Sequence, residues 1–330
     1  MSFTINKDID AHCERPLVSV LCPAYNAEKF IRATLDSMAS QAYDNIEIVI
    51  SDDCSTDNTV EIIKDYLKST ELNVVLNVNP VNLGITPNCN KALSLCTGKY
   101  IALFAGDDLM YPGKIDGQVE LMESDDDCTI CYHSVDILDG DNENKIMFTT
   151  EPSSQRYGSF VDIITGGGFV GVCSVMVRAN AIPSHGFSES LPMVSDWLMT
   201  IEVALRGKVL KLNGVYGGYL RHAKGASRET FETLWEIKET VDFLTNRYNR
   251  NALICKACRV AYKRILIGEI ARLFLSGNRI RLVELKKVYM KDQPFLSIVW
   301  CVAYMTVFLR LNRLNLMKRL YTVFSGAIKR

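Results

Sequence analysis

The first hundred residues alternate between short apolar runs and segments in which apolar residues recur at helical spacing. The apolar runs are short enough to be buried strands, and we expect Pro23 to stop the first of them. Asn26 is the expected cap of the first helix, Asp57 opens the second, and Pro87 lies in the first turn of the third. The predicted strands cover residues 17–22, 46–50, 73–78 and 100–104.

Regular alternation of strands and helices predicts an α/β fold, with a mostly parallel, Rossmann-like sheet flanked by helices. After residue 128 the pattern is mixed, with strands expected at 129–138, 172–177 and 209–212 and a helix at 197–206. From about residue 229 onward the pattern is wholly helical, with helices expected at 230–247, 252–275 and 279–290. We therefore expect an α/β domain over residues 1–228 and a helical C-terminal extension over residues 229–330.

The net charge of the chain changes sign near the boundary between the expected α/β domain and the helical extension. The net charge of −1 is the balance of −16 over residues 1–246 and +15 over residues 247–330. Within the basic part, residues 295–309 carry no charge, but this run is shorter than the roughly 20 residues that span a bilayer. Apolar bulk beside cations favours a helix that lies on an anionic membrane surface. A helical cap on the domain or a dimer contact would explain the same segment, and no nucleic-acid motif accompanies it.

Cysteine usage and the N-terminus indicate a cytoplasmic protein. The eleven cysteines are an odd number and lie in apolar segments, which favours reduced thiols over a disulfide framework. The first fifteen residues lack the apolar core of a secretory signal. With the basic apolar tail, these features predict a peripheral protein on the inner face of the cell membrane.

Paired aspartates follow two of the predicted strands. Asp52 and Asp53 end the second strand, and Asp107 and Asp108 follow the fourth. Neighbouring carboxylates repel each other, and a divalent cation removes that cost because it prefers oxygen ligands. Since ligands bind at the carboxyl ends of parallel strands, these pairs are candidate site residues, although a solvated turn would explain either pair.

Two common nucleotide-binding loops are absent. The first strand is followed by Pro-Ala-Tyr-Asn, residues 23–26, where a dinucleotide-binding protein has Gly-x-Gly-x-x-Gly. The sequence also contains no Gly-Lys-Ser/Thr phosphate loop. Nicotinamide-dependent dehydrogenases and P-loop nucleotidases are therefore disfavoured.

Five motifs in order resemble the inverting glycosyltransferases of family 2, which have the GT-A fold, and the resemblance covers residues 17 to 227. One of them, Ser-Asp-Asp-Cys-Ser-Thr-Asp, is similar to the family's Val-Asp-Asp-Gly-Ser-Thr-Asp. The motifs lie at residues 18–26, 51–57, 82–85, 104–108 and 186–197.

The resemblance implies a role for each candidate residue. Asp196 would be the catalytic base, although it could instead cap the helix predicted to follow it. His222 would reach the metal or the phosphates, although a surface loop would explain it equally. Asp107 and Asp108, with His222, would hold Mn²⁺ or Mg²⁺. The nucleotide-binding residues implied by the resemblance are Pro23, Tyr25, Asn26, Asp52, Asp53 and Asp107.

Three positions depart from the family pattern. Ala105 stands where the metal motif often begins with an aspartate, Ser195 where the base often has a preceding glutamate, and Cys89 where an arginine is common. These departures put the metal geometry, the acidic neighbour of the base and one nucleotide contact in question.

The predicted function is metal-dependent, inverting transfer of a sugar from a nucleotide diphosphate sugar, with UDP as the expected nucleotide. The acceptor is expected to be a hydroxyl of a glycan or of a saccharide carried on a polyprenyl diphosphate, as in bacterial surface-polysaccharide (O-antigen) assembly. Two alternatives stay open: a nucleotidyltransferase, and a non-catalytic membrane-bound assembly subunit that retained the fold.

Overall fold

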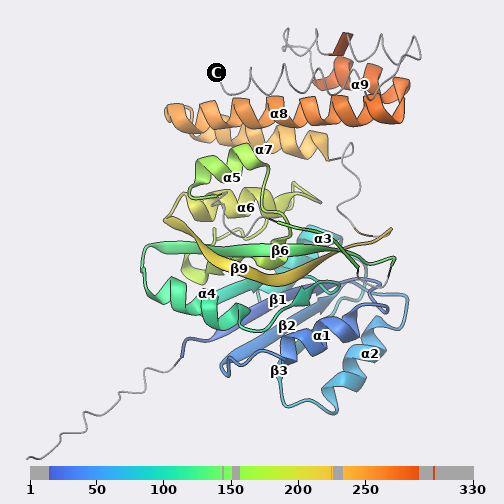
Figure 1. The fold of residues 1–330 in the computed structure, drawn as a ribbon, viewed down its shortest axis with the longest axis vertical. Helices are drawn as coiled ribbons and strands as arrows, with labels where there is room; N and C mark the ends of the chain where they lie inside the picture. Colours follow the sequence, from blue (N-terminus) through green and yellow to red (C-terminus); the bar gives the residue numbers. More distant parts are fainter. Residues whose placement is uncertain are drawn as a thin grey trace, which may run out of the picture.

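The computed structural model shows a twisted central sheet with helices on both faces and a stack of C-terminal helices at one end (Figure 1). The helices α8 and α9 lie at the end of the molecule farthest from β3 and α2 (Figure 1). The structure describes residues 15–142, 145–150, 157–223, 225, 233–289 and 300–301.

Four parallel strands form the first half of the sheet, in the order β3-β2-β1-β4. The chain adds β2 and β3 on one side of β1 and then crosses to place β4 on the other side. This reversal leaves a crevice beyond the carboxyl ends of β1 and β4, where α/β folds bind ligands. The predicted parallel order is thus confirmed for these strands, which are β1 (Val18–Ala24), β2 (Ile46–Asp52), β3 (Asn73–Val78) and β4 (Tyr100–Leu103).

The second half of the sheet is mixed. After β4 the order continues β8-β6-β9-β5, with β7 paired to β6, and only β6 and β9 run parallel to each other. The strand expected at 172–177 is shorter, because residues 172–174 form a 3₁₀ turn. The strand expected at 209–212 is part of a longer one. The strands are β5 (Leu109–Met110), β6 (Cys128–Asp139), β7 (Lys145–Thr149), β8 (Met176–Arg178) and β9 (Lys208–Arg221).

Alternating side chains of β1 divide the apolar core between the two faces of the sheet. Val20 and Cys22 pack in a cluster with residues of α1, α2 and α4, whereas Leu21 packs in a second cluster with residues of α3 and α6. The two faces are therefore covered by different helices, as Figure 1 shows. The helices are α1 (Ile31–Ala39), α2 (Thr59–Leu67), α3 (Ile85–Leu93), α4 (Lys114–Glu123), α5 (Phe160–Gly166) and α6 (Ser195–Ala204).

Three further helices, α7 (Leu234–Arg247), α8 (Ala252–Ser276) and α9 (Arg279–Tyr289), follow the sheet. Val241 and Ile254 join the same core cluster as α6, so α7 and α8 pack on the α/β domain. Within the described parts of the chain, no helix combines the length and the apolar character needed to cross a membrane. The uncharged run 295–309 lies outside the described residues except for 300 and 301.

Two expectations for the first loop were wrong. Pro23 does not stop β1, which continues to Ala24, because the Pro23 carbonyl still accepts a hydrogen bond from the N–H of Gly106 at 3.1 Å. Asn26 is not a helix cap, because α1 begins at Ile31 with Phe30 before it. Asn26 instead has a left-handed backbone, with φ +48°.

Gly98 allows β1 and the start of β4 to approach closely. A Cβ atom at this position would lie 2.6 Å from the Ser19 nitrogen and 2.8 Å from the Leu17 oxygen, both main-chain atoms. We expect Gly98→Ala to lower the free energy of unfolding by about 1–3 kcal/mol, measured by urea denaturation. The control is Gly268→Ala in α8, where nothing lies within 4 Å of the added atom and helix propensity improves stability. Equal unfolding midpoints for the two variants would contradict the prediction.

Candidate active site

A cleft of about 430 Å³ lies beyond the carboxyl ends of β1 and β4. Its lining includes Pro23 from the end of β1, Asp107 and Asp108 from the loop after β4, and Asp196 from α6. Four of the predicted site residues, separated by more than 170 positions in the sequence, therefore meet in one cavity. Ala105 also lines the cleft, at the place where the family motif often has a further aspartate.

The two aspartates after β4 differ in environment. Asp108 is buried, and its Oδ1 accepts a hydrogen bond from the N–H of Leu220 at 3.0 Å. Its Oδ2 is also buried and has no hydrogen-bond partner among the described residues. Burial and the neighbouring Asp107 carboxylate raise the pKa of Asp108 well above its ordinary value. A buried carboxylate oxygen without a donor, beside a second carboxylate, is suited to a cation.

His222 joins this pair from the end of β9. Its Nε2 lies 2.9 Å from Oδ2 of Asp107, and its ring lies against that of Phe30 with the centroids 4.6 Å apart. The side chain is only 12% exposed, so it is not the surface-loop residue that was the alternative interpretation. No group of three or more metal-ligating side chains converges within the described residues. A cation here would need further ligands from a bound molecule, such as phosphate oxygens.

Asp196 is the second residue of α6. The residue before the helix is Val194, which has no side-chain acceptor, so the alternative of Asp196 as the helix cap was wrong. The neighbouring Ser195 Oγ lies 2.8 Å from Oγ1 of Thr86 in α3. Burial raises the pKa of the Asp196 carboxyl, and the carboxylate of Glu236 raises it further. A carboxylate with a raised pKa is a stronger base than an ordinary aspartate.

Glu236 was not identified from the sequence. It lies in α7, is 1% exposed, and its Oε2 accepts hydrogen bonds at 2.9 Å from the N–H groups of Met193 and Val194. The apolar residues of this helix, such as Leu234 and Ile237, predict a buried face. The sequence does not show that a glutamate beside them also points inward. Finding it required knowledge of what α7 packs against.

The aspartates at the end of β2 have structural partners. Asp52 Oδ2 accepts from the N–H of Ser55 at 2.8 Å. Asp53 accepts from the side chain of Asn79 at 3.1 Å and from the main-chain N–H groups of Leu83 at 2.8 Å and Gly84 at 2.9 Å. Asp53 therefore anchors the turn that precedes α3, whatever else it binds.

Tyr25 and Asn26 lie in the loop directly after β1. Tyr25 is 50% exposed, so its ring is available for stacking. Asn26 Oδ1 accepts from the N–H of Thr56 at 2.8 Å, which ties this loop to the one after β2. Tyr25, Asn26, Asp52 and Asp53 lie at adjacent strand ends but do not line the 430 Å³ cleft.

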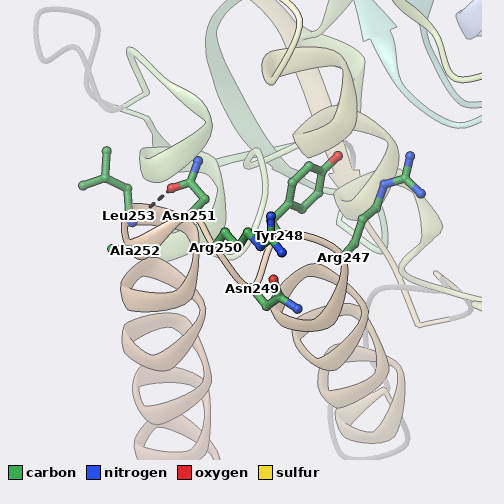
Figure 2. Close-up of a pocket in the computed structure, with 7 residues that line it drawn as sticks. All are labelled: Arg247, Tyr248, Asn249, Arg250, Asn251, Ala252 and Leu253. Atoms are coloured by element: carbon green, nitrogen blue, oxygen red, sulfur yellow. Dashed lines mark hydrogen bonds between the residues drawn. The ribbon is translucent and has the colours of Figure 1, made fainter.

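Figure 2 shows a separate pocket at the turn between α7 and α8. Asn251 caps α8 there by accepting from the N–H of Leu253 at 3.1 Å. The lining of residues 247–253 contains two arginines but no carboxylate and none of the predicted site residues. This pocket therefore offers neither a base nor a cation site, and the cleft beyond β1 and β4 is the candidate active site.

The fold is that of the GT-A glycosyltransferases. The structure of residues 1–349 of TarS from S. aureus, in complex with UDP-GlcNAc, superimposes with a TM-score of 0.63. The alignment covers 88% of this chain and 90% of that one, at 17% sequence identity. The predicted fold class is thereby confirmed.

Residues 19–181 match the model of glycosyl transferase family 2. The matched segment is about half of the chain and contains the strands up to β4 and the paired aspartates. An uncharacterised protein of Mycobacterium bovis is 30% identical over 226 residues, or 67% of this chain. The chain spans 64% of the length of that relative.

A second relative has a named activity. The Escherichia coli protein WfaP, called a UDP-Glc:alpha-D-GlcNAc-diphosphoundecaprenol beta-1,3-glucosyltransferase, is 39% identical over 109 residues. The match covers 33% of this chain and 42% of WfaP.

The role of Asp53 in anchoring the turn before α3 can be tested without substrate. We expect Asp53→Ala to lower the free energy of unfolding by about 2–4 kcal/mol, because three N–H donors lose a charged acceptor. Urea denaturation followed by circular dichroism measures the change. The control is Asp126→Ala in an exposed turn, which we expect to change stability by less than about 0.5 kcal/mol. An unchanged midpoint for Asp53→Ala would show that the carboxylate anchors nothing.

Proposed function

We propose that this protein is an inverting glycosyltransferase that transfers a sugar from a nucleotide diphosphate sugar, with UDP as the nucleotide, to an acceptor hydroxyl. The observation that carries the proposal is the cleft in which Asp107, Asp108 and Asp196 meet. The match to the family model and the printed names of the relatives support the reaction class and the nucleotide.

Asp196 is the proposed base. As the acceptor oxygen forms its bond to the anomeric carbon, the bond from that carbon to the diphosphate breaks on the opposite face. The acceptor proton passes to the Asp196 carboxylate, and the electron pair of the broken bond leaves with the nucleotide diphosphate. Attack opposite to the leaving group inverts the configuration, and one carboxylate is sufficient for it.

Asp107, Asp108 and His222 are the proposed residues for a divalent cation, Mn²⁺ or Mg²⁺. The unpartnered Oδ2 of Asp108 and the adjacent Asp107 carboxylate provide the hard oxygen ligands that these ions prefer. When bound, the ion would stabilise the negative charge that develops on the diphosphate. Asp108 also holds the end of β9, which His222 follows directly, because it accepts a hydrogen bond from the N–H of Leu220.

The base and ribose of the donor are proposed to lie over the loops after β1 and β2. The exposed ring of Tyr25 can stack on a nucleobase, and Pro23 forms the adjoining wall of the cleft. Asp52, Asp53 and Asn26 border this position and are held rigid by their own hydrogen bonds. Their preformed arrangement lowers the entropic cost of binding the nucleotide.

This function can be tested by measuring nucleotide release by the wild-type protein and by variants of the proposed site residues. We expect slow UDP release from a panel of UDP-sugars in the presence of Mn²⁺, measured by a coupled assay. Asp196→Asn should lower kcat/KM by about 10²–10⁴-fold, because the base is lost, while metal-dependent UDP binding is retained. Asp107→Asn should lower both UDP binding and release, because it removes a cation ligand.

Asp126→Asn, in an exposed turn, is the control and should behave as wild type. Wild-type protein that binds no nucleotide with or without metal would support the non-catalytic assembly subunit instead. Release of pyrophosphate from a nucleoside triphosphate would support a nucleotidyltransferase.

We further propose that residues 1–228 form the catalytic domain and that residues 229–330 bring it to the inner face of the cytoplasmic membrane. The acceptor named for WfaP is carried on diphosphoundecaprenol, and a lipid-carried acceptor of this kind would place the reaction at a membrane surface. The +15 net charge of residues 247–330 supports attraction to anionic lipid. Lys256, Arg259 and Lys263 are exposed along α8.

Vesicle binding tests this attachment. We expect the protein to sediment with vesicles containing about one third anionic lipid but not with zwitterionic ones, and salt should release it. Replacing Lys256, Arg259 and Lys263 together by glutamine should weaken binding roughly 100-fold, since each cation contributes about 1 kcal/mol. The control replaces the exposed Lys64 of α2 and Lys68, the residue after that helix, by glutamine. The helix α2 lies at the opposite end of the molecule (Figure 1), so this variant should bind normally. Equal binding to both vesicle types would contradict the proposal.

A further inference from the structure

The segment that leads into Asp196 is held from two sides. On one side Thr86, the second residue of α3, lies 2.8 Å from Ser195 Oγ and donates its hydroxyl proton toward the carbonyl of Leu191 at 2.7 Å. On the other side Glu236 of α7 accepts from the N–H groups of Met193 and Val194. The first of these residues belongs to the α/β domain, whereas the second belongs to the C-terminal helices.

Glu236 accepts hydrogen bonds from the N–H groups of Met193 and Val194, the two residues that precede α6. The N-terminal N–H groups of a helix and the residues just before it need acceptors, and α6 has no side-chain cap of its own. A carboxylate at this end is also favoured by the helix dipole. Because Glu236 is buried, water does not compete for these two hydrogen bonds. The orientation of the first turn of α6, which carries Asp196, therefore depends on Glu236.

The charge of Glu236 also acts on Asp196. Among the described residues, the thiol of Cys89 in α3 also interacts with Asp196; burial raises its pKa to about 12, so it is neutral. Glu236 is thus the charged neighbour that disfavours ionisation of Asp196. Removing this negative charge lowers the pKa of Asp196, so ionised Asp196 persists to lower pH.

We infer that Glu236 is a positioning residue for the catalytic base, contributed to the active site by the C-terminal helix α7. The inference rests on the proposed function, in which Asp196 accepts the proton of the acceptor. It assigns to α7 a role in the reaction in addition to packing on the domain. Glu236 gives Asp196 an acidic neighbour, which the preceding residue Ser195 does not provide.

Two substitutions separate position from charge. Glu236→Gln retains an oxygen that can accept from Met193 and Val194 but removes the negative charge. We expect it to keep kcat within a few-fold at neutral pH and to move the acid limb of the kcat/KM profile to lower pH. Glu236→Ala removes both, and we expect kcat to fall about 10–100-fold with the KM of the donor and the Kd of UDP unchanged.

Glu239 gives a matched control on the same helix. It lies one turn further along α7 and is exposed, so Glu239→Gln and Glu239→Ala should leave kcat and the pH profile as in wild type. The measurements use the full-length protein with the UDP-sugar that wild type turns over fastest, with Asp196→Asn as the inactive reference.

The outcomes distinguish this inference from the function on which it rests. If wild type is active, Asp196→Asn is inactive, and both Glu236 variants keep wild-type kcat and pH profile, then the inference is wrong and the proposed function stands. If Glu236→Ala does not fold, Glu236→Asp shortens the side chain and moves the acceptor away from Met193 and Val194, and wild-type kcat in that variant overturns the inference. If wild type releases nucleotide from no nucleotide sugar, the proposed function fails and this inference fails with it.

Discussion

The site depends on one constraint, which is that a carboxylate buried away from water must accept hydrogen bonds. Here the donors are main-chain N–H groups. Asp53 receives them from the turn before α3, Asp108 from β9, and Glu236 from the segment before α6. Each interaction satisfies a buried charge and at the same time fixes a segment distant in sequence. Asp108 therefore both lines the cleft and fixes β9, whereas Asp53 and Glu236 fix segments beside the cleft without lining it.

This double role explains why the aspartates are found at strand ends. At the carboxyl edge of a parallel sheet the loops contain N–H groups that no strand or helix uses, so they are available to carboxylates. The exception is Oδ2 of Asp108, which has no donor in the described part of the chain. This unsatisfied oxygen lies next to a second carboxylate, which is the structural reason for expecting a cation.

Much of the fold followed from periodicity. The four apolar runs became β1 to β4. The strands β1, β2 and β4 are buried on both faces and leave apolar runs that are easy to recognise, and the edge strand β3 is only partly buried. The antiparallel second half was predicted less well, since β8 is only three residues long and β9 contains several glycines. Local features also misled: Pro23 was compatible with the end of a strand, and Asn26 had a left-handed conformation that its sequence neighbours do not reveal. The meeting of Pro23, Asp107 and Asp196 in one cleft was predicted through motif order, whereas Glu236 depends on helix packing and has no motif.

The turn held by Asp53 has a consequence for how the two ends of the cleft communicate. Gly84, which donates to Asp53, immediately precedes α3, and Thr86 in the first turn of that helix contacts the segment that carries Asp196. Only a few covalent and hydrogen bonds thus separate the loop after β2 from the segment that carries Asp196. A displacement of the turn held by Asp53 would therefore be passed through α3 to the segment that carries Asp196.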